Sequence, residues 1–225
     1  MIKKDKTFIC IATGPSITEE DIAYVKSMKQ QYPDDIKIVA VNDAWRLFYD
    51  SEKQSCQLLD HLYAADDTWW NTYLEEINQC IDRDQIKLWI PVKKDFAKKH
   101  NMNYIKLYHG KNGLCTEDMA LYSGSHSGYQ AINLSYHLGA KKIVLLGYDM
   151  KVKDTSHIHY FGNHPKGLRN SPNGYTKWVS HYNKLSVDAN RCGLDIINCS
   201  RDTAITCFTQ AIIQEIELTD NVRNQ

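Results

Sequence analysis

The stretch SGSHSGYQAINLSYHLGAKKIVLLGYDM, Ser123–Met150, decides the fold. It predicts a turn of small residues, a helix over 128–138, a glycine stop at 139 and a buried strand over 142–148. The nearly continuous apolar run from Lys142 to Leu146 is typical of a strand that is covered on both faces, as in a parallel sheet. Gly139 stands where a helix end often needs a left-handed residue.

A second unit of the same kind opens the chain. Phe8–Ala12 predicts a strand, Thr13-Gly14-Pro15-Ser16 a tight turn, and a helix follows to about residue 31, with a capping box at 16–19. Two such strand–turn–helix corners predict an α/β fold: a Rossmann-like, doubly wound, mostly parallel sheet with helices on both faces. We expect this sheet to bind a phosphorylated ligand, because glycine-rich corners of this kind present backbone N–H groups to anions.

The rest of the chain continues the alternation of strands and helices. Further strands are predicted at 36–41, 56–60, 86–92 and 194–199, and further helices at 44–49, 68–81, 178–191 and 204–218. The segment of about 151–177 is rich in Gly, His, Asn and Pro and has little periodicity, which favours a functional loop. We therefore expect one nucleotide-binding domain over 1–225 with a polar, lid-like insertion at about 151–177.

Composition excludes several classes of protein. The 225 residues include 27 basic and 27 acidic side chains, and this balance argues against broad nucleic-acid binding. No segment approaches the roughly 18 apolar residues of a membrane span. Seven scattered cysteines without CxxC spacing indicate reduced thiols and hence a cytoplasmic location. The aromatic content leaves a homo-oligomer open.

Polar residues follow the first two strands. Glycine at position 14 lets the backbone approach a phosphate, and Ser16 can donate its hydroxyl, although the same residues also suit a plain strand–helix turn. Asn42 and Asp43 end the second strand, where they could bind a ribose, base or phosphate, or could serve as a turn or helix cap.

The second corner offers another set of candidates. His126-Ser127-Gly128 suits either an anion site at a helix start or an ordinary serine cap, and His126 could instead cover a ligand ring. Gly147 and Asp149 follow the strand, and Asp149 could hold a sugar hydroxyl, a metal or a neighbouring loop. Lys151 and Lys153 could neutralise a leaving phosphate.

The late polar segment carries three histidines, His157, His159 and His164. Histidine is the natural general base near neutral pH. A divalent metal site and a solvated polar loop are the competing interpretations. Aromatic residues that could stack on a sugar or a base are Tyr63, Trp69, Trp70, Tyr175 and Trp178.

The order of these motifs resembles the family 42 glycosyltransferases, bacterial sialyltransferases that use CMP-sialic acid. The shared order is GPS after the first strand, Asn after the second, a Ser-Gly helix start, a G-x-D element and an HY-[FI]-G-x-H-like segment. It also resembles a wider group of phage and bacterial proteins known as domain of unknown function 115, which includes hydroxymethylpterin pyrophosphokinases. The resemblance implies a variant of the GT-A-like architecture, and it covers most of the chain from residue 8 to about 208.

The resemblance also implies roles for particular residues. It assigns nucleotide contacts to Gly14, Pro15, Ser16 and Asn42, and donor contacts to Ser127 and Gly128. The family's general base is the last histidine of its HYIGH segment. Here that segment reads HYFGNH with one extra residue, so His164 is the first choice and His159 the second. Lys151 or Tyr160 would support the leaving phosphate.

These observations predict a metal-independent glycosyltransferase that uses a CMP-sugar-like donor, has no cofactor and acts on an unknown acceptor hydroxyl. One alternative is a Mg²⁺-dependent ATP pyrophosphokinase with Asp43, Asp60 or Asp149 as metal ligands. Another is a non-catalytic nucleotide-binding phage protein.

Overall fold

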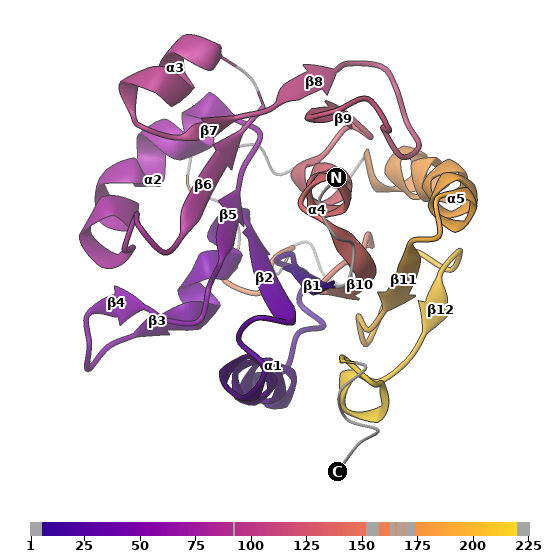
Figure 1. The fold of residues 1–225 in the computed structure, drawn as a ribbon, viewed down its shortest axis with the longest axis horizontal. Helices are drawn as coiled ribbons and strands as arrows, with labels where there is room; N and C mark the ends of the chain where they lie inside the picture. The colour runs from indigo at the N-terminus through magenta and orange to yellow at the C-terminus, as the bar shows by residue number, and fades with distance from the viewer. Residues whose placement is uncertain are drawn as a thin grey trace.

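A computed structural model describes residues 6–91, 93–151, 158–162, 165, 168 and 174–219. Its centre is a parallel eight-stranded sheet with the order β12-β11-β10-β1-β2-β5-β6-β7 (Figure 1). The strands are β1 (Lys6–Ile11), β2 (Ile36–Val41), β5 (His61–Tyr63), β6 (Lys87–Ile90), β7 (Asn103–Tyr104), β10 (Ala140–Leu146), β11 (Asp195–Asn198) and β12 (Thr209–Gln210). The predicted Rossmann-like α/β fold is confirmed.

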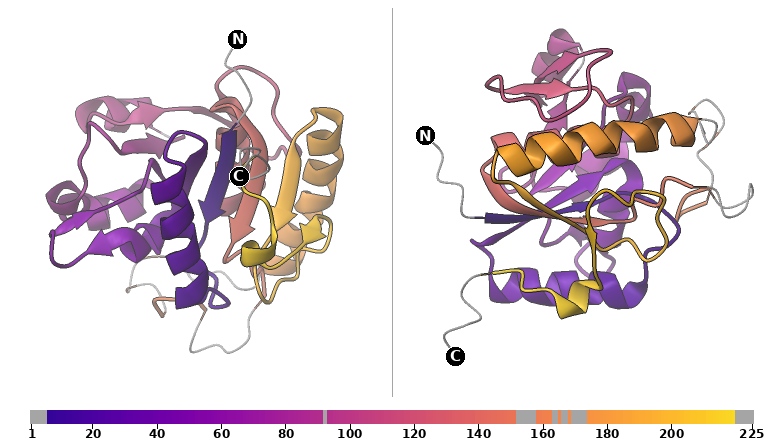
Figure 2. Two further views of the ribbon diagram at one scale, coloured as in Figure 1. Left: turned by 60° about the horizontal axis from the view of Figure 1, so that its bottom comes forward. Right: turned by 90° about the vertical axis from the view of Figure 1, so that its right-hand side faces the viewer.

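Helices cover both faces of this sheet, and Figure 2 shows α5 on one side and α1 on the other. The helices are α1 (Glu19–Gln31), η1 (Asn42–Phe48), α2 (Asp67–Cys80), α3 (Lys94–Lys99), α4 (Ser127–His137), α5 (Tyr175–Arg191) and η3 (Ile213–Glu215). Two small pairs complete the fold, the antiparallel β3 (Tyr49–Asp50) with β4 (Ser55–Cys56), and the parallel β8 (Lys106–Tyr108) with β9 (Ala120–Tyr122). No helix in these ranges is long and apolar enough to cross a membrane.

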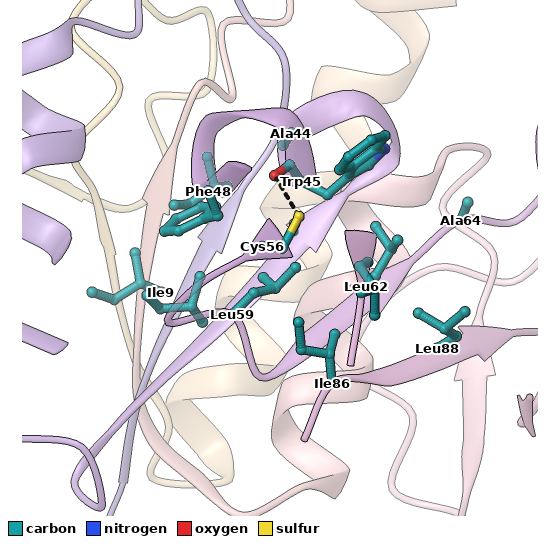
Figure 3. Packing of buried hydrophobic residues seen from close by; sticks show 14 of the residues in the cluster. Ile9, Ala44, Trp45, Phe48, Cys56, Leu59, Leu62, Ala64, Ile86 and Leu88 are labelled. Atoms are coloured by element: carbon teal, nitrogen blue, oxygen red, sulfur yellow. Dashed lines mark hydrogen bonds between the residues drawn. The ribbon is translucent and has the colours of Figure 1, made fainter. Parts of the chain in front are cut away.

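Alternating side chains of the central strands enter two separate cores. In β1, Ile9 and Ile11 join the cluster under α1 and α2, whereas Phe8 and Cys10 join the cluster under α4 and α5. Figure 3 shows the first cluster, where η1 and β4 pack over the sheet and the Cys56 thiol donates to the Trp45 carbonyl. Each fully buried aliphatic side chain contributes about 1.5–3 kcal/mol. Burial on both faces explains why these strands are apolar without alternation.

The third predicted strand is wrong in position. Ser55–Cys56 belongs to the β3–β4 pair, and the strand beside β2 begins only at His61. The Asp60 carboxylate accepts hydrogen bonds from the Lys29 ammonium at 3.0 Å and from the Ile38 amide at 2.8 Å. Asp60 therefore precedes β5 instead of ending a strand, at the amino edge of the sheet.

The last predicted helix, over 204–218, is also wrong. This segment instead contains strand β12 and the short η3, because its backbone groups are bonded elsewhere. The Ala204 amide donates to the Asp149 carbonyl at 2.8 Å, and the Asn198 side chain donates to the Ile205 carbonyl at 3.2 Å. The predicted capping box is replaced by Thr18, whose hydroxyl accepts from the Asp21 amide.

The order of the strands defines where a ligand can bind. From β1 the chain moves outward through β2, β5, β6 and β7, and then returns through α4 to β10 on the other side of β1. The carboxyl ends of β1 and β10 therefore flank a topological switch point. In open α/β sheets this is the place where ligands bind.

Candidate functional site

A cavity of about 310 Å³ opens at this switch point. Seven segments that are far apart in the sequence line it: the turns after β1, β2 and β10, the starts of α2, α4 and α5, and the segment around His159. Its described lining residues are Ala12, Thr13, Gly14, Pro15, Val41, Asn42, Asp66, Ser125, His126, Ser127, Gly128, Gly147, Asp149, Met150, Lys151, Ile158, His159, Tyr175 and Trp178.

Most of the residues singled out from the sequence meet in this cavity. Those that line it are Thr13, Gly14, Pro15, Asn42, His126, Ser127, Gly128, Gly147, Asp149, Lys151 and His159. Ser16, Asp43 and Tyr160 do not line it. Three further candidates lie outside the described residues: Lys153, His157 and His164. Of these, His164 was the first choice for the general base.

The turns after β1 and β10 are bonded to each other. The Gly14 amide donates to the Gly147 carbonyl at 2.9 Å. The Ser16 amide and hydroxyl both donate to the Asp149 carboxylate, at 2.8 and 2.6 Å. A Cβ at position 14 would lie 2.4 Å from an Asp149 oxygen, so only glycine permits this approach. The Ser16 hydroxyl, expected to contact a phosphate, is thus used within the protein.

Asp149 is a buried carboxyl at the edge of the cavity. Burial raises the pKa of Asp149 to about 6, while the two hydrogen bonds from Ser16 act in the opposite direction. The nearby Asp202 raises the pKa further, and Lys151 lowers it. A carboxyl with this pKa changes its charge just below neutral pH, and in its ionised form it can accept a hydrogen bond from a ligand hydroxyl.

His126 caps helix α4. Its Nδ1 accepts a hydrogen bond from the Tyr129 amide at 3.3 Å, and its Nε2 lies 3.1 Å from the Tyr182 hydroxyl. The ring also stacks on Trp178, with 5.2 Å between the ring centroids. Burial, with the neighbouring His181, lowers the pKa of His126 to about 3. The cap of α4 is therefore His126, and the predicted serine cap is wrong, because Ser127 is already the first helical residue.

The first turn of α4 faces the same cavity. Ser127 and Gly128 both line it and occupy the first two helical positions, where an α-helix leaves its amide donors without intrahelical partners. The Ser127 hydroxyl accepts from the Ala65 amide at 3.3 Å, which ties this turn to the end of β5. Such a helix start can hold an anion.

The segment around His159 is bonded to the turn after β1. The Tyr160 amide donates to the Thr13 carbonyl at 2.7 Å, and His159 Nδ1 lies 3.1 Å from the Thr13 hydroxyl. The Tyr160 side chain, which was expected at the leaving phosphate, packs instead against the apolar cluster on the α1 side. Lys151 lines the cavity and forms an ion pair with Asp202.

The residues after β2 have different environments. Asn42 lines the cavity with φ at +50°, whereas the Asp43 carboxylate accepts from the Trp69 indole at 2.9 Å and is buried. Ser125 and Met150 also line the cavity with positive φ, at +76° and +49°. Left-handed backbone at non-glycine residues costs about 1–3 kcal/mol each and concentrates at functional sites.

The three candidate metal ligands of the pyrophosphokinase alternative do not form one cluster, and no group of three possible ligands occurs in the described part of the chain. Asp43 is bonded to Trp69, Asp149 to Ser16, and Asp60 to Lys29 at the opposite edge of the sheet. The prediction that Asp60 could bind a metal beside Asp149 is therefore wrong. Asp60 lies before the start of β5, whereas Asp149 lies after the end of β10, so the two are at opposite edges of the sheet.

Sequence reasoning missed several lining residues. One of them is Asp66, which occupies the N-cap position of α2. Its side chain makes no capping hydrogen bond to the helix. If β5 had been predicted at its correct position, Asp66 would have been recognised as a polar residue shortly after the carboxyl end of a strand, and hence as a candidate site residue. Of the five candidate stacking aromatics, Tyr175 and Trp178 line the cavity, whereas Tyr63, Trp69 and Trp70 are buried in the cores.

A comparison with protein-family models finds no match to this chain, and no curated protein is significantly similar to it. The functional assignment therefore rests on the residues and geometry of the cavity.

Proposed function

We propose that this protein is a metal-independent glycosyltransferase that transfers a sugar from a CMP-sugar-like donor to an acceptor hydroxyl. One observation carries the proposal. A histidine within hydrogen-bond distance of Thr13, the start of a helix and two aromatic rings line the same cavity at the switch point of the sheet. The family resemblance stated from the sequence supports the same activity.

The donor would bind with its phosphate at the start of α4. The first-turn amides of Ser127 and Gly128, which have no intrahelical partners, and the helix dipole favour an anion there by about 0.3–1 kcal/mol at an exposed site, and by up to about 2 kcal/mol when partly buried. The Asn42 amide would donate and accept hydrogen bonds with the nucleoside, and the Asp66 carboxylate would accept them from its hydroxyls. Tyr175 and Trp178 offer ring faces to the base or the sugar.

The proposed base is His159. If its Nδ1–H donates to the Thr13 hydroxyl, this contact fixes the tautomer and the orientation of the ring, and Nε2 is the atom that would take the proton. Nε2 takes the proton of the acceptor hydroxyl while that oxygen bonds to the anomeric carbon. The bond from this carbon to the phosphate oxygen breaks, and the nucleotide leaves with the electron pair. Lys151, turning from Asp202 to the phosphate, would stabilise the departing charge.

The test is the release of CMP from CMP-sialic acid, with and without an added lactose acceptor, in buffer containing EDTA. A substitution His159→Gln should lower transfer by about 10²–10⁴-fold, the usual contribution of a general base, and leave donor binding within about twofold. His109→Gln, an exposed histidine in the turn after β8, is the matched control and should keep full activity.

Two results would contradict the assignment. If His164→Gln abolishes transfer and His159→Gln does not, the base is His164, as the family motif first implied. If no nucleotide sugar is turned over by the wild-type protein but ATP and Mg²⁺ support pyrophosphate transfer, the glycosyltransferase proposal is wrong.

A further inference from the structure

A second cavity, of about 590 Å³, lies between the loop that joins β8 to β9 and the C-terminal half of α5. Its described lining residues are Gly110, Lys111, Asn112, Leu114, Thr116, Tyr122, Lys184, Asp188, Arg191 and Cys192. None of these lines the cavity at the switch point, which meets α5 only at its first residues, Tyr175 and Trp178. The volume is within the range of small-molecule sites.

Three cations line this cavity, and two of them share one carboxylate. The Lys184 ammonium lies 3.1 Å from an Asp188 oxygen, and the Arg191 guanidinium lies 3.8 Å from the other. Asp188 also accepts a hydrogen bond from the Leu114 amide at 3.2 Å. The charge of this single carboxylate is therefore divided among two cations and one amide.

The third cation, Lys111, comes from the opposite wall. Its ammonium lies 4.6 Å from the ring centroid of Tyr108 and 5.5 Å from that of Tyr122. Cation–π contacts of this kind orient an ammonium without neutralising it. The nearby Glu117 is bonded to Lys106 and the Tyr108 hydroxyl and does not line the cavity.

The local charge is positive even when the helix is counted. The C-terminus of α5 contributes about half a negative charge, and Arg191 lies in its last turn. The negative charges of Asp188 and of this dipole together offset only about half of the positive charge of the three cations. The cavity therefore favours an anion, and the oxygens of a phosphate group can contact cations on both walls at once.

We propose that this cavity is a second binding site, which takes a small molecule that carries a phosphate group. The phosphate lies between Lys111 on one wall and Lys184 and Arg191 on the other, and any organic part rests on Leu114 and Tyr122. The proposal is independent of the activity at the switch point.

The probes are inorganic phosphate and glucose 6-phosphate, titrated by calorimetry and by amide shifts in NMR spectra at low salt. We expect saturable binding with amide shifts at Gly113 and Leu114. The substitutions Lys184→Ala and Arg191→Ala should each weaken binding by about fivefold, the contribution of one exposed ion pair. Both side chains are exposed, so the two variants should fold.

Lys177→Ala, which removes an exposed lysine from the other end of α5, is the matched control and should bind like the wild type. Tighter binding of glucose 6-phosphate than of phosphate supports the site and assigns its ligand to sugar phosphates, and equal binding supports it as a site for the phosphate group alone. Absence of saturable binding, or binding that the Lys184 and Arg191 variants leave unchanged, overturns the proposal.

Discussion

Single residues at the turns after β1 and β10 set the shape of the cavity. Gly14 was predicted to let the backbone approach a phosphate, and the structure shows that the group packed against it is the Asp149 side chain. Ser16 was predicted to contact the ligand because a hydroxyl after a strand suits a phosphate. Its actual partner is 133 residues away in the sequence, and no local pattern reports such a distant contact.

Substituting Gly14→Ala should destabilise the protein by about 1–3 kcal/mol, the usual cost of overpacking. The new methyl group would lie 2.4 Å from an Asp149 oxygen and 2.5 Å from the rigid Gly147 carbonyl, so the turn must move. Urea unfolding measures the loss. Gly193→Ala is the control. A Cβ added at position 193 meets no atom within 4 Å, so only the backbone φ of +66° destabilises this variant, by about 1 kcal/mol. Equal stability of Gly14→Ala and the wild type would contradict the geometry.

The Asp149 carboxyl should make stability depend on pH. Its pKa in the folded state, about 6, is above the usual value of about 3.9, so the folded protein holds this proton more tightly than the unfolded chain. Its stabilising contribution is complete below about pH 4 and is lost as the pH rises through about 6. The loss amounts to about 3 kcal/mol.

The comparison of the wild type with Asp149→Asn isolates this effect, because the amide does not titrate. Free energies of unfolding in urea, measured from pH 4 to pH 7, should show the wild type losing stability relative to the variant. A difference between the two proteins that stays constant over this range would show that Asp149 titrates normally.

At the scale of elements, α4 depends on an unusual cap. His126 bonds the Tyr129 amide with one ring nitrogen and approaches the Tyr182 hydroxyl with the other, which joins α4 to α5. The sequence predicted the helix and its start. It left the role of His126 open, because the partner that orients the ring comes from α5.

Replacing His126 with alanine should cost about 2–4 kcal/mol. The cap contributes about 1 kcal/mol, and the loss of the ring leaves the buried Tyr182 hydroxyl without this partner, which costs about 1–3 kcal/mol. The substitution His126→Asn can still cap the helix, so it should recover only the roughly 1 kcal/mol that the cap contributes. Thermal and urea unfolding measure both variants. If the asparagine variant is no more stable than the alanine variant, the cap is not the source of the loss.

Element prediction succeeded where burial left a continuous apolar run, as in β1, β2 and β10. It failed at residues 56–60, because the CQLLD pattern suits a strand although Asp60 is held by Lys29 before β5 begins. It failed again at 204–218, where the helical spacing is outweighed by hydrogen bonds to Asp149 and Asn198.

At the scale of the whole molecule, the order of the strands creates the site. The sequence predicted a doubly wound sheet, but not that β10 lies beside β1, because register and neighbours depend on contacts between distant segments. This pairing brings the turn of residues 13–16 to the turn of residues 147–149. It also places the start of α4 and His159 at the same cavity.

The most direct measurement is the melting temperature of the protein with CMP, CDP, UDP, GDP, ADP, ATP and CMP-sialic acid, each with and without Mg²⁺. A ligand present at 100 times its dissociation constant adds about 2.7 kcal/mol, which raises the melting temperature by about 5–10 °C for a chain of this size. We predict such a rise with cytidine nucleotides without Mg²⁺. Stabilisation by ATP only with Mg²⁺, or by none of these nucleotides, would contradict a nucleotide-sugar site at the β1–β10 switch point.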